Sequence, residues 1–159
     1  MSTTIALGEG LRDEDISWLF QVGEQRAVHP GTAIVHEGRR PNSIFLVIRG
    51  GFNVVVESVA DEPLAKLGAG ELVGEISFLE GSPASATIVA DQESAVLEID
   101  NRVLKERIRE NTAFAARLYR AFALIAERRL RNRVDHLAFR FEFGRSTGSQ
   151  HGVCIPVFE

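Results

Sequence analysis

The residues whose types and spacing could do chemistry gather in residues 74–90, with the sequence GEISFLEGSPASATIVA. Gly74 and Glu75 begin a short turn of helix, residues 81–83 predict a tight loop, and a strand begins near Ala86. This segment sets a carboxylate and several hydroxyls around a glycine-containing loop. The segment of residues 74–90 contains no lysine or arginine. Its chemistry therefore depends on whether it can hold an anion without a cation of its own.

The rest of the chain offers no recognisable catalytic arrangement. No nucleophile–base pair, glycine loop of the Walker type or paired-carboxylate motif occurs. A metal site on a β-roll needs two histidines one residue apart, so that alternate strand positions converge on the metal. His29 and His36 are seven residues apart, and the other histidines are His136 and His151. We expect neither a metal nor an enzymatic activity.

The length and composition predict one globular domain. A chain of 159 residues with 45% hydrophobic and 25% charged residues can bury a sizeable core. No apolar run approaches the roughly 20 residues that a membrane-spanning helix requires, and residues 1–10 lack the pattern of a secretory signal. Cys154 is the only cysteine, so we expect a reducing, cytoplasmic location.

Charge is unevenly distributed along the chain. Residues 111–140 contain seven arginines and two acidic residues, a net charge of +5, which leaves −9 for the remainder because the whole chain carries −4. The negative total argues against general nucleic-acid binding. A basic helix on an acidic body can dock on that body, on a partner or on an anion, or it can form a solvated face.

Hydrophobic periodicity predicts a β-rich middle between helical ends. Residues 12–22 predict a short helix with Ile16, Leu19 and Phe20 on one face. From about residue 25 to residue 99, short apolar runs alternate with glycine and proline turns. The predicted strands are residues 33–36, 44–48, 52–59, 64–67, 86–90 and 95–99. Their close spacing, without long helices between them, predicts an antiparallel sandwich, roll or barrel.

After Asp100 the period becomes helical again. Asp100 or Asn101 caps a predicted short helix, and a longer helix follows over residues 111–137. One apolar stripe along it contains Phe114, Leu118, Phe122 and Ile125, and a second contains Tyr119, Ala123, Ala126, Leu130 and Leu137. The first stripe would pack on the chain's own sheet. The second has heptad-like spacing and two small alanines, which favours a homodimer seam.

Residues 138–159 are expected to form a tail beyond the long helix. Phe139, Phe141 and Phe143 alternate with polar residues, which is typical of a strand, and residues 153–158 are apolar again. This pattern predicts a terminal hairpin or the beginning of a further element. No helix-turn-helix pattern follows the long helix, so we do not expect a transcription factor.

Two motifs give the chain a resemblance to a known family. The first is PGTAIVHEGRRPNSIFLVIRGGFNVV over residues 30–55, with turn glycines at 31, 38 and 50, and the second is residues 74–90. Together they resemble the cyclic-nucleotide-binding domains of bacterial catabolite activators and protein kinase A regulatory subunits, over about residues 11–137. The resemblance implies a mainly β fold with flanking helices. This fold would be an antiparallel, jelly-roll-like β-roll with a short N-terminal and a long C-terminal helix, in one domain of residues 1–137.

The resemblance also implies roles for the second motif, residues 74–90, which we call the cassette. In the family a glycine–glutamate pair binds the ribose, and here these residues are Gly74 and Glu75. Ile76 and Ser77 follow in the short helix of residues 75–79, whose N-terminal amides would face the phosphate. The long helix would cover the base. Its lid residues would be Leu118, Tyr119 and Phe122.

The loop of the cassette departs from the family at one position. Ser85 would donate its hydroxyl to a phosphate oxygen, the amides of Ala84, Ser85 and Ala86 could also donate, and Thr87 would face the ligand or the roll interior. The family's arginine, which pairs with a phosphate oxygen, is replaced by Ala84. Such a charge-assisted hydrogen bond is worth roughly 1.5–3 kcal/mol, so its loss weakens binding by about one to two decades. Two turn residues, Arg39 and Arg40, either reach the phosphate or remain surface charges.

The resemblance implies a stand-alone regulatory domain that binds a cyclic mononucleotide, cAMP or cGMP. Binding would move the C-terminal helices by a population shift. Its output would be an unidentified effector protein or a rearranged homodimer. The alternative is a ligand-independent interaction or dimerisation module, in which the cassette is degenerate and the arginine-rich helix of residues 111–137 binds the partner.

Overall fold

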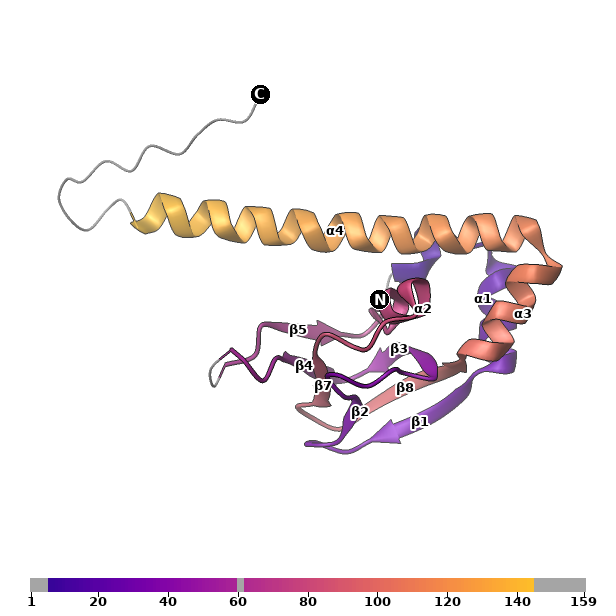
Figure 1. Ribbon diagram of the computed structural model, residues 1–159, viewed down its shortest axis with the longest axis horizontal. Coiled ribbons are helices and arrows are strands. Elements are labelled where there is room, and N and C mark those ends of the chain that lie inside the picture. The colour runs from indigo at the N-terminus through magenta and orange to yellow at the C-terminus, as the bar shows by residue number, and fades with distance from the viewer. Residues whose placement is uncertain (1–5, 60–61, 145–159) are drawn as a thin grey trace, which may run out of the picture. The chain divides into compact units, whose positions relative to one another are not determined.

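The computed structural model describes residues 6–59 and 62–144, and it describes side chains from Leu7 to Arg133 within these ranges. The chain divides after Ile125 into two compact units, which we describe separately. The elements in chain order are the 3-10 helix η1 (Ala6–Glu9), α1 (Asp13–Val22), β1 (Glu24–Val28), β2 (Ala33–Val35), β3 (Ser43–Arg49), β4 (Gly51–Val55), β5 (Ala65–Gly68), β6 (Leu72–Val73), α2 (Glu75–Glu80), β7 (Thr87–Ala90), β8 (Ser94–Asp100), α3 (Asn101–Glu110) and α4 (Thr112–Gly144) (Figure 1).

The strands form two antiparallel sheets of four strands each (Figure 1). The strand order is β1-β8-β3-β6 in the first sheet and β2-β7-β4-β5 in the second. The longest pairing joins β3 to β8, from Ser43 opposite Asp100 to Arg49 opposite Ala95. The antiparallel β-roll predicted from the sequence is confirmed, with its short N-terminal helix and long C-terminal helix.

Two strands, β1 and β6, were not predicted. Only Val28 of β1 is buried, so this strand lacks the apolar alternation that identifies a half-buried strand. β6 has only two residues, which is too short for any periodicity to appear. Both strands exist because they pair with neighbours distant in sequence, β1 with β8 and β6 with β3.

Strand β3 of the first sheet is buried on both faces over residues 43–47. Along β3, Ile44 and Leu46 point into a cluster shared with the helices, whereas Phe45 and Val47 point into a cluster between the sheets. Successive side chains of a strand point to opposite faces. The unbroken apolar run from Ile44 to Ile48 therefore reflects a strand with no solvent face.

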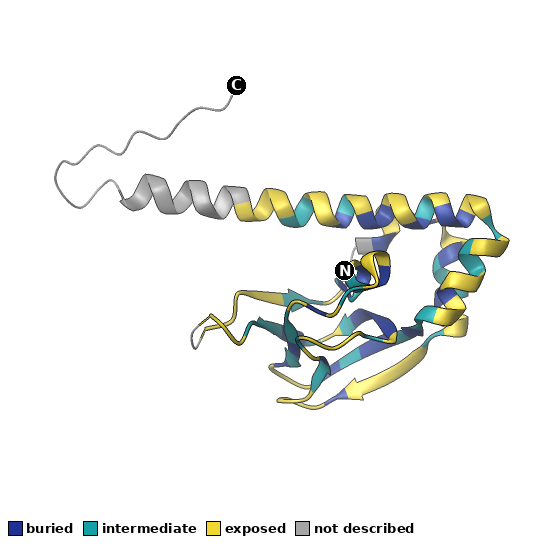
Figure 2. Ribbon diagram, in the orientation of Figure 1, coloured by how far each residue is buried: buried dark blue, intermediate teal, exposed yellow. Residues whose placement is uncertain are grey.

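The helices of the first unit cover the outer face of this sheet. The first predicted stripe of α4 is buried, with Phe114 and Leu118 fully enclosed. A Cβ on Gly10 would lie 2.7 Å from backbone and side-chain atoms of Ala121, so only glycine allows the N-terminal segment to approach α4 this closely. In the second predicted stripe, Tyr119 is 45% exposed and Leu130 is 64% exposed. Figure 2 shows this mixture of buried and exposed residues along α4.

The expected strand over residues 139–143 is wrong, because α4 continues to Gly144. Phe139 and Phe143 are four residues apart, a spacing that fits a helix as well as alternation does. A run of five residues cannot separate the two periods. The expected hairpin beyond Gly144 lies outside the described residues, as does the side chain of Leu137. Of the helices that the structure describes, none is long and apolar enough to span a bilayer.

A buried ion pair joins α1 to α4 within the first unit. Asp15 is 1% exposed, and both of its carboxylate oxygens accept hydrogen bonds from Arg117, at 2.7 Å from Nε and 2.8 Å from Nη2. The backbone amide of Arg12 donates to the same carboxylate at 3.0 Å. The hydrogen bond from Arg117 lowers the pKa of Asp15 from its ordinary value, against the opposing effect of burial.

We expect Asp15→Asn to lower the free energy of unfolding at pH 7 by roughly 1.5–3 kcal/mol, because it removes the charge-assisted hydrogen bonds from Arg117. The pKa of Asp15 is depressed in the folded state. Its contribution is therefore present above the unfolded value near 3.8 and is lost as the pH falls below it. Urea unfolding from pH 7 to pH 3 should show the gap between variant and wild type shrinking.

The matched control is Glu127→Gln, which removes the exposed Glu127–Arg131 pair of the second unit. It should change the free energy of unfolding by less than about 0.5 kcal/mol. A gap for Asp15→Asn that stays constant down to pH 3 would contradict this account of the pair.

Candidate functional site

Gly74 and Glu75 are held in place where β6 turns into α2. Gly74 has a φ of 92°, a left-handed conformation that favours glycine. A Cβ at this position would also lie 3.1 Å from the carbonyl oxygen of Ser43. The turn leaves Glu75 only 5% exposed at the first position of α2. The chain therefore fixes a buried carboxylate at the beginning of the cassette.

The predicted helix turn is observed, and Ile76, Leu79 and Glu80 of this helix are exposed. Ile76 is 55% exposed, and Ser77 is half-buried. Gly81 ends α2 in a left-handed conformation, and its amide donates to the carbonyl of Ser77 at 2.8 Å. The short helix therefore presents Glu75 and Phe78 inward and Ile76 toward solvent.

Ala84 belongs to the apolar cluster between the two sheets, where it is 8% exposed. Its amide donates to the carbonyl of Arg39 at 2.8 Å, and its carbonyl accepts from the amide of Gly38 at 2.8 Å. One expected phosphate donor, the amide of Ala84, is therefore already used by the turn that carries Arg39. The side chain of Arg39 itself is exposed.

The next positions of the loop differ in their surroundings. Ser85 is exposed and Ala86 is half-buried. The Thr87 hydroxyl accepts a hydrogen bond from the amide of Glu37 at 3.0 Å, so it holds the 36–39 turn against β7. Of the hydroxyl groups expected at the site, that of Ser85 is the one that faces solvent.

The three lid residues lie in different environments. Leu118 and Phe122 are buried, at 0% and 2% exposure, whereas Tyr119 is 45% exposed. The Phe122 ring meets the Phe78 ring of α2 edge to face, with ring centroids 6.1 Å apart, and the Tyr119 ring lies 6.5 Å from that of Phe122. The cassette helix is therefore in direct contact with α4. The sequence did not predict Phe78 as part of the site, although its position on a short apolar helix marks it as buried.

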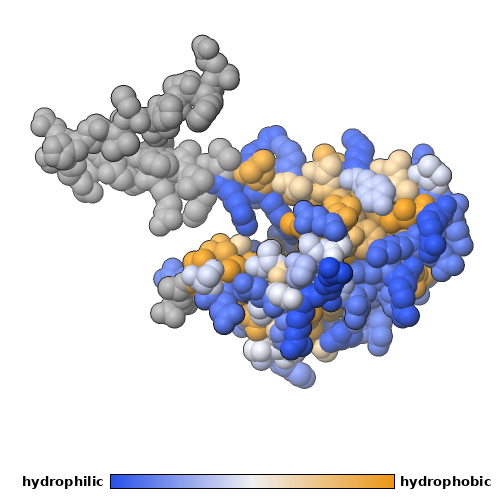
Figure 3. All heavy atoms as spheres, viewed as in Figure 1, coloured by the Kyte–Doolittle hydropathy of each residue, from blue (hydrophilic) through white to orange (hydrophobic). Residues whose placement is uncertain are grey.

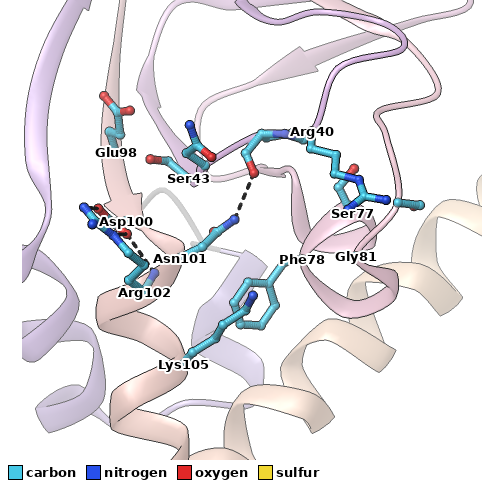
Figure 4. A pocket seen from close by; sticks show the side chains of 13 residues that line it. Arg40, Ser43, Ser77, Phe78, Gly81, Glu98, Asp100, Asn101, Arg102 and Lys105 are labelled. Atoms are coloured by element: carbon cyan, nitrogen blue, oxygen red, sulfur yellow. Dashed lines mark hydrogen bonds and ion pairs between the residues drawn. The ribbon is translucent and has the colours of Figure 1, made fainter.

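A separate hollow of about 700 Å³ lies between residues 40–43, α2, the end of β8 and the beginning of α3 (Figure 4). Residues Gly74 and Glu75 do not line it, and neither do residues 84–87. The sequence did not predict this hollow because three segments distant in sequence, residues 40–43, 77–82 and 98–105, form its wall. Among the residues that the structure describes, no group of three or more His, Cys, Asp or Glu side chains could hold a metal ion.

The chain belongs to the cyclic nucleotide-binding domain family, whose sequence pattern matches residues 25–111, just over half of the chain. The cAMP-dependent protein kinase regulatory subunit of Blastocladiella emersonii is 25% identical over 100 residues, which cover 62% of this chain and 25% of that protein. The chain thus spans about a quarter of the length of this curated relative.

Solved structures agree with the family assignment. A cyclic nucleotide-binding domain from Methylobacillus flagellatus aligns with a TM-score of 0.74 and 20% identity, over 87% of this chain and 76% of that one. The catabolite activator protein of Thermus thermophilus aligns with a TM-score of 0.67 and 26% identity, over 85% of this chain and 64% of that one. The family resemblance stated from the sequence is therefore confirmed.

Proposed function

We propose that the cassette binds a cyclic mononucleotide, cAMP or cGMP, and that the protein acts as a regulatory domain without enzymatic activity. The observation that carries this proposal is the buried carboxylate of Glu75, fixed by Gly74 at the beginning of α2 within the segment that matches the family. A carboxylate can accept a hydrogen bond from a ribose hydroxyl. The single cysteine supports a cytoplasmic location for this activity.

The contact between Phe78 and Phe122 supports a route from the cassette to α4. Phe78 lies three residues after Glu75 on the six-residue helix α2. A ligand that binds Glu75 can therefore shift the helix that also carries Phe78. Any shift of α2 must repack Phe122, because closely packed aromatic rings cannot interpenetrate. A ligand that favours one packing over the other would shift the population of α4 positions.

In this proposal the phosphate affinity depends on Ala84, at the position where the resemblance implies an arginine. A phosphate bound near Glu75 would be repelled by the like charge of its carboxylate, because no cation of the cassette neutralises either group in this partly buried site. The two backbone hydrogen bonds of Ala84 to the 36–39 turn make Arg39 the first candidate to compensate. Arg40, in contrast, lines the separate hollow.

Isothermal titration with cAMP and cGMP up to millimolar ligand tests the proposal directly. We expect saturable binding by the wild type. Glu75→Ala should weaken this binding at least tenfold, because the ribose hydroxyl loses its charged acceptor. Glu80→Ala, at the exposed end of the same helix, is the matched control and should bind like the wild type.

Because Glu75 is buried, thermal unfolding of each variant must accompany the titration, and Glu75→Gln provides a variant of the same size. If folded Glu75 variants bind cAMP as tightly as the wild type, the assignment of the pocket is wrong. Absence of any binding by the wild type would favour the alternative, a ligand-independent interaction module.

Ala84→Arg should tighten cAMP binding by about tenfold or more, because it restores a charge-assisted hydrogen bond to the phosphate. Ala84→Met, which adds length without charge, is the control and should bring no gain. If Ala84→Arg also brings no gain, another group already holds the phosphate. A loss of affinity in Arg39→Ala would then identify that group.

We further propose that the second stripe of α4 forms a homodimer seam. Tyr119 and Leu130 are exposed large apolar residues, and Ala123 and Ala126 are small and exposed on the same helix. Figure 3 shows apolar residues, in orange, along α4 beside hydrophilic residues in blue. Small residues in such a stripe allow close helix approach.

Ala126→Glu should convert the dimer to monomer in light scattering, because it places a carboxylate in the seam. Ala113→Glu is the matched control, since Ala113 is exposed on the same helix but lies outside the stripe. A wild type that is already monomeric would refute the seam.

A further inference from the structure

The hollow beside α2 has a charge imbalance that its own ion pairs do not remove. Its wall contains three cations, Arg40, Arg102 and Lys105, and two carboxylates, Glu98 and Asp100. Asp100 pairs with Arg102 at 2.9 Å, and Glu98 pairs at 2.5 Å with Arg26 outside the hollow. Both carboxylates are thereby engaged. Among the described residues, the structure gives no carboxylate partner to either Arg40 or Lys105.

Arg40 and Lys105 approach the hollow from different elements. Figure 4 shows Arg40 reaching from the 40–43 segment toward Ser77 and Gly81 of the α2 end, while Lys105 extends from α3 beside the Phe78 ring. The Lys105 ammonium lies 5.8 Å from the centre of that ring. The two cations therefore lie at the wall of one hollow rather than on separate surfaces.

The wall that carries Arg40 is anchored to the beginning of α3. The Asn101 amide donates to the carbonyl of Asn42 at 2.9 Å, and its side-chain amide donates to the carbonyl of Pro41 at 3.1 Å. The next amide of the helix, that of Arg102, donates to the Asp100 carboxylate at 2.7 Å. The first two amides of α3, those of Asn101 and Arg102, are thus occupied and cannot bind an anion in the hollow. The 40–43 segment is held in place without a ligand.

We propose that this hollow is a second ligand site, distinct from the proposed ribose site at Glu75. The hollow would bind a small molecule through a phosphate or carboxylate group of that molecule. Arg40 would bind the oxyanion with its planar guanidinium, and Lys105 would add a point charge. A hollow of about 700 Å³ has room for a small molecule larger than a lone phosphate. The hydroxyls of Ser77 and Ser43 lie in the same wall and can bond the rest of the ligand.

The test uses the full-length protein labelled with nitrogen-15, titrated with inorganic phosphate and with citrate at constant ionic strength, which keeps screening fixed. We expect saturable amide shifts at Ser77, Ser82 and residues 101–105. Arg40→Gln and Lys105→Gln should each weaken this binding by about tenfold. Lys66→Gln is the control, because Lys66 is an exposed lysine near Asp91 that does not line the hollow.

The preference between the two probes identifies the group: stronger phosphate binding indicates a phosphate ligand, and stronger citrate binding a carboxylate. The proposal would be overturned if the amides at the hollow showed no saturable shift, or if both variants bound the probes as tightly as the wild type does. Amide shifts mainly at residues 128–133 would indicate an adventitious ion only. Glu75→Gln should leave the shifts intact. Loss of cAMP binding in that variant alone would thus separate the two sites.

Discussion

Within the sheet β1-β8-β3-β6, strand β3 is covered on both faces, by helices on one side and by the second sheet on the other, so residues 44–47 are at most 4% exposed. A shift of one residue in the pairing of β3 with β8 would exchange the two sets of side chains and misfit both clusters. This pairing therefore holds its register. Strand β6 pairs with Phe45 and Leu46 of β3, and the cassette follows β6 in sequence. The fixed register of β3 therefore also positions β6 and the cassette.

The cassette packs against the two sheets through one charged and one apolar residue. Glu75 is a buried carboxylate fixed by the left-handed turn at Gly74, whereas Ala84 contributes a methyl group to the apolar cluster between the sheets. An unpaired guanidinium in that cluster would carry a desolvation cost until a phosphate arrived. Alanine avoids this cost in the free protein. In the proposed function, the affinity for a phosphate would then depend on neighbouring groups such as Arg39.

Helix α2 is the element on which the cassette, the hollow and α4 converge. Glu75 begins the helix, and Phe78 in its middle contacts both the ring of Phe122 and the ammonium of Lys105. A helix of six residues cannot bend internally without losing its few hydrogen bonds. Ligands at the two sites would thus act on one rigid segment, and any coupling between their affinities would be reciprocal.

The sequence by itself determined the β-roll, the cassette and the buried stripe of α4, because turn glycines and apolar periods are local signals. It did not determine β1 and β6, which exist through pairing with distant strands, or the helical continuation to Gly144, where a five-residue alternation fits two periods. Asp15 is one of three consecutive acidic residues in the first turn of α1, a position that favours any acid. Only the tertiary structure decided that it is buried against Arg117, and only it brought Arg40 and Lys105 to one hollow, because such contacts join residues that no local pattern connects.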